Sequence, residues 1–322
     1  MKILITGGAG FIGYHLTMAL HTLGHSVVIY DAFTNYVDER NSRYLPYLQI
    51  RLKELKNCSK AFVRGDITDT RRLIDTIHEH QPEVIVNLAA VPIATASNQL
   101  AREATSSNLY GIVSLLESIR STDSVRRFVY VSSSFVYGNF VTDPADEEHP
   151  LDPIDVYGGT KLAGEILTKS FGRRFGIEYV IIRPSAVYGP TDANRRVTQV
   201  FIEKAFSGEP LTLHDGGEGR VDFTYVDDVV QGFVLATTKP EAANEIFNIT
   251  RGEGRSMKEF AKILSRHIPN VKTVVTPADE VRPNRGSLSI EKARRILGYA
   301  PQYSLEDGME LYINYLKENN LV

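Results

Sequence analysis

The feature that most constrains this fold is a glycine-rich loop near the N-terminus. Gly7, Gly10 and Gly13 form the loop. A strand-like apolar run over residues 2–6 precedes it, and a helical pattern over residues 10–23 follows it. Glycines at this spacing allow a tight turn, close approach of main-chain N–H groups to a ligand, and close packing of a helix on a strand. The chain therefore begins with a strand–loop–helix unit.

Strand-like and helix-like segments then alternate through the first half of the chain. Short apolar runs predict buried parallel strands at residues 2–6, 26–30, 61–64, 84–88, 127–132 and 179–183. Helical patterns cover residues 10–23, 69–79, 104–119 and 157–175, and a charged stretch over 38–60 is interpreted as a surface helix and loop. This alternation predicts an α/β fold with a Rossmann-type doubly wound parallel sheet.

The pattern changes after Pro184 into shorter pieces separated by glycine and proline. Here we expect helices at 197–206, 257–266, 290–297 and 305–318, a hairpin over 215–225, and a strand at 245–249 that returns to the first sheet. These expectations divide the chain into two domains. Residues 1–183 with about 227–250 would bind a dinucleotide, and residues 184–226 with 251–322 would form a smaller C-terminal α/β substrate lobe.

Charge and cysteine content exclude several classes of protein. Lys and Arg number 36 against 39 Asp and Glu, a net charge of −3, so no basic excess favours nucleic acid as a partner. The single cysteine, Cys58, excludes an internal disulfide framework and a thiolate-rich metal site. No apolar stretch predicts a signal peptide or membrane span, so we expect a soluble, cytoplasmic protein without a membrane partner. The acidic segment 147–150 contains one histidine, His149, and is interpreted as solvated surface rather than a metal site.

An acidic residue completes the dinucleotide signal. Asp31 closes the second predicted strand, where a carboxylate can hydrogen-bond the ribose hydroxyls of an adenosine. The same carboxylate would repel a 2′-phosphate, and the adjacent Ala32 and Phe33 provide no arginine. The N-terminus of the first helix, at Phe11 and Ile12, would face the diphosphate. These residues predict an NAD cofactor rather than NADP.

A second group of residues predicts chemistry at the same edge of the sheet. Tyr157 and Lys161 lie four residues apart and so share one side of a helix. The serine-rich segment 132–138 follows a predicted central strand, at the end of the sheet where ligands bind.

The ordered motifs resemble the extended short-chain dehydrogenase/reductase family, and in particular its NAD-dependent nucleotide-sugar epimerases and dehydratases. UDP-hexose 4-epimerases are the most similar group. The motifs are the glycine loop, Gly65-Asp66-Ile67, Asn87-Leu88-Ala89-Ala90, the serine segment, Tyr157 with Lys161, and Arg183-Pro184-Ser185-Ala186-Val187-Tyr188-Gly189-Pro190.

The resemblance implies roles for individual residues. Tyr157 would be the acid/base, and Lys161 would lower its pKa and hold the nicotinamide ribose. Ser133 would hydrogen-bond the reacting sugar hydroxyl. Further cofactor contacts implied by the resemblance are Thr34, Asn35, Asp66, Ile67, Leu88, Ala89, Ala90, Pro92, Asn108 and Ser185.

The residues after Ser133 favour an epimerase. Dehydratases and decarboxylases of the family tend to carry an acidic residue there, whereas this chain has Ser134 and Phe135. Phe135 cannot move a proton, so oxidation and return of a hydride at C4 of a UDP-hexose or UDP-hexuronate is the favoured reaction. Three alternatives stay open: a nucleotide-sugar dehydratase or decarboxylase (a lyase), a net 4-keto-sugar reductase, and a non-catalytic dinucleotide-binding protein.

The nucleotide-sugar side carries several departures from the family pattern. Arg282 resembles the arginine that grips the diphosphate. Arg220 lies one position from the usual arginine, so it either reaches the ligand through a bulge or is a solvated surface residue. Ala186 occupies a slot where many relatives have asparagine. Arg195 and Arg196 are candidates for a sugar, phosphate or uronate contact. By analogy with the family, helices near 104–119 and 157–175 predict a homodimer.

Overall fold

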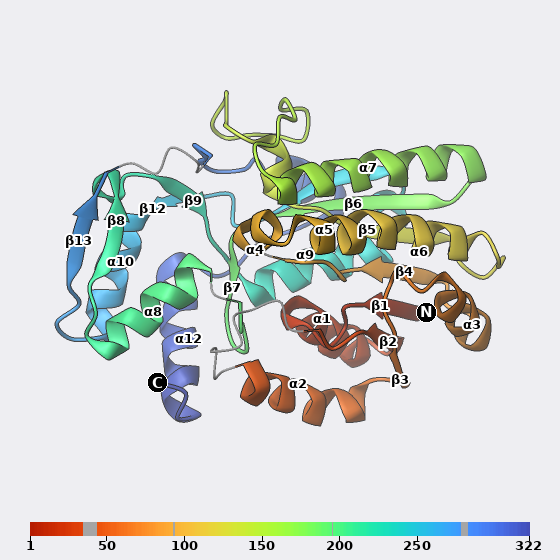
Figure 1. Ribbon diagram of the computed structural model, residues 1–322, viewed down its shortest axis with the longest axis horizontal. Helices are drawn as coiled ribbons and strands as arrows, with labels where there is room; N and C mark the ends of the chain where they lie inside the picture. The colour runs from red at the N-terminus through yellow and green to blue at the C-terminus, as the bar shows by residue number, and fades with distance from the viewer. Residues whose placement is uncertain (35–43, 93, 195, 278–282) are drawn as a thin grey trace.

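The computed structural model describes residues 1–34, 44–92, 94–194, 196–277 and 283–322. Its centre is a seven-stranded parallel sheet with the strand order β11-β6-β5-β4-β1-β2-β3 (Figure 1). The strands are β1 (Lys2–Thr6), β2 (Ser26–Asp31), β3 (Ala61–Arg64), β4 (Val84–Asn87), β5 (Arg127–Val131), β6 (Glu178–Pro184) and β11 (Glu245–Ile249). This confirms the predicted Rossmann-type sheet, including the strand at 245–249 that returns to it.

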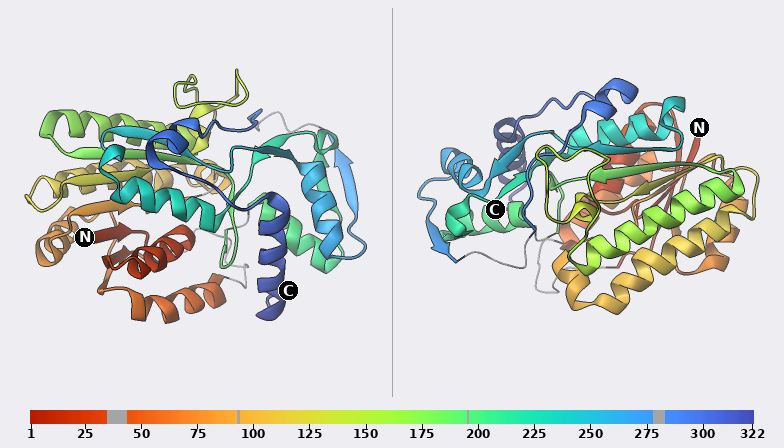
Figure 2. Two further views of the ribbon diagram at one scale, coloured as in Figure 1. Left: turned by 180° about the vertical axis from the view of Figure 1, so that it is seen from behind. Right: turned by 90° about the horizontal axis from the view of Figure 1, so that it is seen from above.

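Helices cover both faces of this sheet (Figure 2). Those that pack around it are α1 (Phe11–Thr22), α2 (Tyr44–Cys58), α3 (Thr70–His80), α6 (Gly111–Ile119), α7 (Val156–Phe175), α9 (Val226–Thr238) and α11 (Glu291–Leu297). Successive β1 side chains enter different cores: Ile3 and Ile5 join the core under α1 and α9, whereas Leu4 joins the core under α3 and α6. The alternation follows from the two-residue period of a strand, and it explains why the strands are apolar on both sides.

A second, smaller region lies beside the carboxyl ends of the strands (Figure 1). It contains α8 (Val197–Ser207), α10 (Met257–His267) and α12 (Leu305–Glu318) around a separate apolar core. Two short sheets complete it: β8 (Leu211–His214) with β13 (Thr273–Thr276), and β9 (Arg220–Asp222) with β12 (Gly254–Ser256). A further small sheet pairs β7 (Val187–Tyr188) with β10 (Thr224–Tyr225).

Three details differ from the sequence-based expectations. The hairpin over residues 215–225 is wrong, because β9 pairs with the distant β12 and β10 pairs in parallel with β7. Helix α9 was not expected, because its sequence is apolar on most sides and rich in valine, a pattern that hides helical periodicity. Helix α11, which the sequence placed with the second region, buries Ala293 and Leu297 in the sheet core beside Phe247 of β11.

The topology places a binding edge at the carboxyl end of β1. This strand lies between β4 and β2, so the chain leaves the sheet in opposite directions on its two sides. Such a switch point opens a crevice for ligands. The connections α4 (Ala94–Gln99), α5 (Ala101–Thr105) and a π-helical turn over Ser106–Tyr110 follow β4 at this edge. Among the described residues, no helix is both long and apolar enough to cross a membrane.

Candidate active site

The loop after β1 accepts only glycine at two points. Gly7 has a φ of 71°, and a Cβ there would lie 2.7 Å from the main-chain nitrogen of Ala89. A Cβ on Gly13 would collide with the Gly7 carbonyl oxygen and would lie 2.7 Å from the Gly8 Cα. Side chains at these two positions would therefore prevent the close approach of the loop to the first turn of α1 and to the residues after β4.

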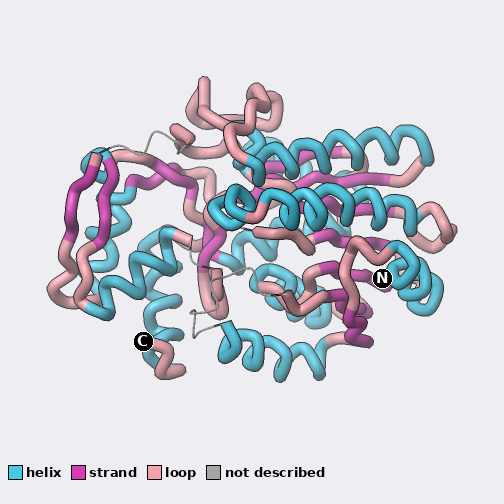
Figure 3. The backbone as a smooth tube through the Cα atoms, in the orientation of Figure 1, coloured by secondary structure: helices cyan, strands magenta, loops and turns pink. Residues whose placement is uncertain are grey.

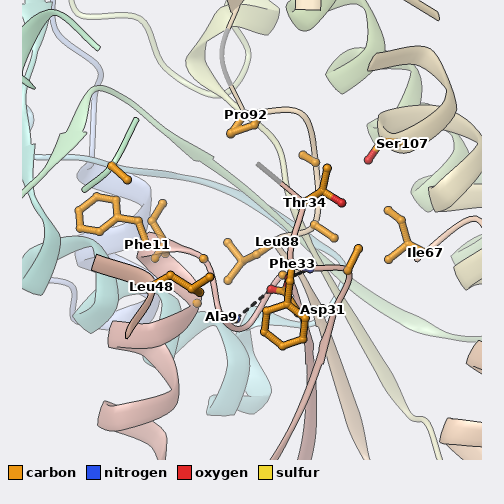
Figure 4. Close-up of a pocket in the computed structure, with 18 of the residues that line it drawn as sticks. Ala9, Phe11, Asp31, Phe33, Thr34, Leu48, Ile67, Leu88, Pro92 and Ser107 are labelled. Atoms are coloured by element: carbon orange, nitrogen blue, oxygen red, sulfur yellow. Dashed lines mark hydrogen bonds between the residues drawn. The ribbon is translucent and has the colours of Figure 1, made fainter. Parts of the chain in front are cut away.

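Asp31 is tied to this loop by its carboxylate (Figure 4). Its Oδ2 accepts a hydrogen bond from the Ala9 N–H at 2.9 Å, and its Oδ1 accepts one from the Phe33 N–H at 2.7 Å. Burial raises the pKa of Asp31, while the two N–H donors and the charge of Arg51 act to lower it. Each carboxylate oxygen retains a lone pair for a ribose hydroxyl.

A cavity opens above the loop, and most predicted cofactor residues line it. The predicted residues on its wall are Gly7, Gly10, Phe11, Ile12, Gly13, Asp31, Thr34, Asp66, Ile67, Leu88, Ala89, Ala90 and Pro92, with Arg196 from the substrate set. Asn35 lies outside the described residues. The described residues Asn108, Tyr157, Lys161 and Ser185 are not on this wall.

Sequence reasoning missed other parts of the wall. They are Tyr44, Leu48 and Arg51 of α2, with Ser107, Ala193 and Asn194. Only a charged pattern in the sequence marked α2, and nothing local indicated that one of its arginines faces the glycine loop. The cavity as a whole fits a dinucleotide, because it combines a helix N-terminus for phosphates, a carboxylate for ribose and apolar walls for the rings.

Ser133, Tyr157 and Lys161 meet at the end of β5. Ser133 precedes a short 3₁₀ turn, Ser134–Tyr137, and its Oγ accepts a hydrogen bond from the Phe135 N–H. Helix α7 carries Tyr157 and Lys161, and it begins where the Asp155 carboxylate accepts the Gly158 N–H at 2.7 Å. The Lys161 Nζ lies 5.9 Å from the centre of the Tyr157 ring. The three candidate catalytic side chains are thus brought together by the strand end and the helix start.

The pKa values of Tyr157 and Lys161 are governed first by burial. Burial raises the pKa of Tyr157 above its usual value, while the positive charge of Arg196 and a hydrogen bond with Ser133 act to lower it. Burial lowers the pKa of Lys161 to about 8, against the opposing charge of Glu165. The expectation that Lys161 lowers the pKa of Tyr157 stays a prediction. The Lys161 ammonium donates to the Val131 carbonyl oxygen at 2.9 Å, and the cation that acts on the phenol is Arg196.

A buried ion pair supports the catalytic strand and helix from behind. The Arg183 Nη2 and the Glu165 Oε2 lie 2.7 Å apart, and neither side chain is more than 1% exposed. The Ser132 hydroxyl donates to the Glu165 Oε1 at 2.6 Å. The pair therefore joins β5, β6 and α7 directly beneath Ser133, and such a buried pair is tolerated when its remaining polar atoms are bonded.

Asn108 fastens the connection after β4 to α7. Its Oδ1 accepts the Val91 N–H at 2.7 Å, and its Nδ2 donates to the Thr160 Oγ1 at 3.2 Å. The residue lies in the π-helical turn, an irregularity that is frequent at functional sites. In this structure Asn108 contacts protein groups on both sides and shapes the site from its rim.

The predicted sugar-side residues Ser134 and Ala186, and the predicted cofactor residue Ser185, are found near the strand ends. Ser134 is 1% exposed, and its Oγ is buried without a hydrogen-bond partner. Ser185 is also buried. Ala186 has a φ of 34°, in the left-handed region that asparagine adopts more readily than alanine. The asparagine of many relatives at this slot therefore suits the backbone conformation, and alanine holds it with strain.

The described arginines of the sugar side differ in their surroundings. Arg196 precedes α8, lines the cavity and forms an ion pair with the buried Asp192 at 3.5 Å. The half-exposed Arg220 donates to the Asp143 carboxylate at 3.1 Å and to the Gly254 carbonyl oxygen at 2.8 Å, and it is not on the cavity wall. Arg195 and Arg282 lie outside the described residues.

The segment 147–150 is only partly the solvated surface that its sequence suggested, because Glu148 and Pro150 are exposed but the other two residues are buried. Glu147 is 9% exposed and His149 is 5% exposed. The Glu147 Oε1 accepts the Asn248 N–H, and the His149 Nε2 accepts the Val141 N–H. The error arose because local acidity was taken for exposure, whereas these two side chains accept main-chain N–H groups of β11 and of the loop at Val141.

Comparison with known proteins agrees with this geometry. Residues 3–250 match the model of the NAD-dependent epimerase/dehydratase family. A putative UDP-glucose 4-epimerase of Methanocaldococcus jannaschii is 32% identical, with 99% of this chain and 99% of that protein aligned. The crystal structure of UDP-glucuronic acid 4-epimerase from Bacillus cereus, in complex with UDP-glucuronic acid and NAD, has a TM-score of 0.88 at 30% identity and covers 99% and 100% of the two chains. The dTDP-glucose 4,6-dehydratase DesIV from Streptomyces venezuelae, with NAD bound, has a TM-score of 0.87 at 26% identity over 99% and 98%. This chain belongs to the NAD-dependent epimerase/dehydratase family.

Proposed function

We propose that this chain is a nucleotide-sugar 4-epimerase that acts on a UDP-hexose or UDP-hexuronate through a 4-keto intermediate. The observation that carries the proposal is the environment of Tyr157. Its ring meets the edge of Phe135 at 5.6 Å between centroids, so an aromatic ring occupies the slot where a lyase would place a second acid. Bound NAD supplies the acceptance and return of a hydride. The protein supplies one acid/base, and epimerisation needs no other.

The side chains of the site divide this work. The Tyr157 oxygen takes the proton of the sugar 4-hydroxyl and later returns it to the same oxygen, when C4 of the 4-keto sugar accepts the hydride on its opposite face. The Ser133 hydroxyl hydrogen-bonds the same sugar oxygen and, through its bond with Tyr157, favours the phenolate. Lys161 adds positive charge close to the ring. Turning of the sugar between the two transfers decides which epimer is formed.

Product analysis tests the proposal. The purified protein is incubated with catalytic NAD and UDP-glucose, UDP-glucuronate, UDP-N-acetylglucosamine, or GDP- and dTDP-hexoses, and products are followed by mass and proton NMR. We expect unchanged mass and inverted coupling at C4 for a UDP-sugar. Loss of water or carbon dioxide would establish a lyase instead, the alternative that the likeness to DesIV keeps open. Stoichiometric consumption of NADH would establish a reductase.

For the sugar, we propose that Arg196 contacts an anionic or hydroxyl group of the substrate. It lines the cavity, and its charge acts on Tyr157, so it lies close to where the reacting sugar must bind. A carboxylate at C6 would suit its guanidinium. The Bacillus cereus relative is solved with UDP-glucuronic acid. For Arg195, Arg220 and Arg282 the sugar or diphosphate contact stays a prediction.

We propose further that the chain forms a homodimer through α6 and α7. Apolar side chains on the α5–α6 segment and on α7 face solvent, with Tyr110 at 65%, Ile166 at 53% and Phe175 at 40% exposure. Figure 1 shows α6 and α7 side by side on one face. A four-helix contact would bury these side chains. The unpaired Cys58 is consistent with a reducing, cytoplasmic location.

We also propose that different parts of the chain bind the cofactor and the nucleotide sugar. Residues 1–183 with about 227–250 hold the cofactor, and residues 184–226 with 251–322 bind the nucleotide sugar. The support is that the sheet and its glycine loop come from the first set, while the second region has its own apolar core.

A further inference from the structure

Arg51, on the wall of the cofactor cavity, carries a buried polar atom without a hydrogen-bond partner, and two more such atoms lie in the segment that it contacts. Arg51 of α2 is 3% exposed; its Nη1 donates to the Thr191 carbonyl oxygen at 3.0 Å, while its Nε has no partner. The adjoining Thr191 Oγ1 and Asp192 Oδ2 are also buried without a hydrogen bond. A buried donor that remains unmet, such as the Arg51 Nε, costs about 1–3 kcal/mol, so it marks a place where an acceptor on a ligand completes the bonding. The Asp192 oxygen is an acceptor, and its charge is balanced by Arg196.

Arg51 is a cation directed at this cavity. It lines the cavity together with Asp31, and the negative charges of Asp192 and Asp31 act on its guanidinium. A guanidinium remains protonated even when buried, so Arg51 brings a full positive charge to the wall. Asp192 is already ion-paired with Arg196 at 3.5 Å, and among the described residues no hydrogen bond joins Arg51 to a carboxylate.

The position of Arg51 is next to the start of α1. Leu48, one turn earlier on α2, lies beside Phe11 and Ala9 in Figure 4. His15 of α1 contacts the Pro190 carbonyl oxygen at 3.0 Å, which places the segment carrying Thr191 against the same helix. The first turn of α1 is the part of the fold that attracts phosphate, through its free N–H groups and its dipole.

We propose that Arg51 binds the diphosphate of the dinucleotide, opposite the N-terminus of α1. The Arg51 guanidinium donates hydrogen bonds to phosphate oxygens, while its Nη1 keeps its hydrogen bond to the Thr191 carbonyl oxygen. The phosphates then lie between main-chain N–H groups and a side-chain cation. This assignment adds a residue of α2 to the cofactor site. It concerns cofactor binding alone and does not depend on which sugar reaction the protein catalyses.

Binding measurements on the full chain, without any sugar substrate, test the assignment. Dissociation constants for NAD, NADP, ADP and adenosine are measured by calorimetry for the wild type, Arg51→Met, Arg51→Lys and the control Lys53→Met. Lys53 is an exposed residue of the same helix, so the control removes the same charge outside the cavity. We expect Arg51→Met to weaken NAD and ADP about tenfold or more and Arg51→Lys to weaken them less, with adenosine and the Lys53 variant unchanged.

Three results would overturn the proposal. Unchanged NAD affinity in a folded Arg51→Met protein would make Arg51 a structural residue satisfied by water. Equal weakening of adenosine and ADP would show damage to the adenosine pocket instead of loss of a phosphate contact. A gain or loss seen with NADP alone would place Arg51 at the ribose 2′-position. If Arg51→Met does not fold, Arg51→Lys carries the test, and the same selective loss on ADP over adenosine is required.

Discussion

The cofactor side and the sugar side of this cavity present different kinds of groups. On the cofactor side, the main-chain loop between Gly7 and Gly13 and one carboxylate, Asp31, face the ligand, and they are held by short contacts to the sheet. On the proposed sugar side, the described candidates are long charged side chains that already have protein partners: Arg196 of the cavity wall with Asp192, and Arg220, which lies off that wall, with Asp143.

This difference has a physical consequence. A main-chain cradle tolerates almost no change in shape, because each wall is close-packed backbone. Charged side chains can exchange one partner for another, so the sugar side can change its specificity while the fold and cofactor site stay intact. We expect substitutions on the two sides to separate cleanly into losses of folding or cofactor binding and losses of substrate preference.

The largest expected effect lies where the two sides meet. Tyr157→Phe removes the only acid/base that we assign, and general acid–base catalysis contributes about 10²–10⁴-fold, so kcat should fall about 10³-fold. NAD affinity, measured by calorimetry, should stay within twofold. Retention of full turnover by a folded Tyr157→Phe protein would refute the assigned mechanism.

A substitution in the loop tests the rigidity of the cofactor side. Gly13→Ala places a methyl group against the Gly7 carbonyl oxygen, so the free energy of unfolding should fall by about 1–3 kcal/mol and NAD binding should weaken. Gly159→Ala is the matched control, because a Cβ there meets no atom within 4 Å and the residue is inside α7. The control should gain about 0.5–1 kcal/mol in urea unfolding. Equal losses in both variants would mean that the loop is not close-packed.

The charge of Arg196 should affect both substrate affinity and pH dependence. Its positive charge lowers the pKa of Tyr157, so Arg196→Ala should raise that pKa. Because the phenolate is the base, the acid limb of the kcat/KM profile should move to higher pH. KM for the preferred substrate should rise about tenfold, the cost of one charge-assisted contact. An unchanged KM for every active substrate, with an unshifted pH profile, would remove Arg196 from the site.

The smallest effect is expected at Arg220. Its ion pair with Asp143 is between half-exposed groups, so Arg220→Ala should change the free energy of unfolding by less than about 1 kcal/mol. If Arg220 keeps this position during turnover, KM should be unaffected. A large rise in KM with unchanged stability would instead show that Arg220 leaves Asp143 to bind the diphosphate, the reading left open by the sequence.

Sequence patterns correctly predicted the elements whose structure depends mainly on residues that are close together in the chain. The strands of the sheet and the glycine loop follow from apolar runs and residue spacing, and the observed elements agree with them. Helix α9 was not expected, because its many valines and apolar sides obscure the helical periodicity of the sequence. The 215–225 hairpin was wrong, because β9 pairs with the distant strand β12. His149 appeared exposed for a similar reason: its partner, the Val141 N–H, is identified only in the folded turn.

The sequence by itself determined the dinucleotide fold, the NAD preference at Asp31 and the candidate trio Ser133, Tyr157 and Lys161, because these depend on short spacings along one strand or helix. Only the tertiary structure decided which charges reach the trio. The charge of Arg196 acts to lower the pKa of Tyr157, and Arg51 of a separate helix lines the same cavity as the glycine loop. Electrostatic interactions depend on the distance between charges and on their burial, and neither quantity follows from the order of the residues along the chain.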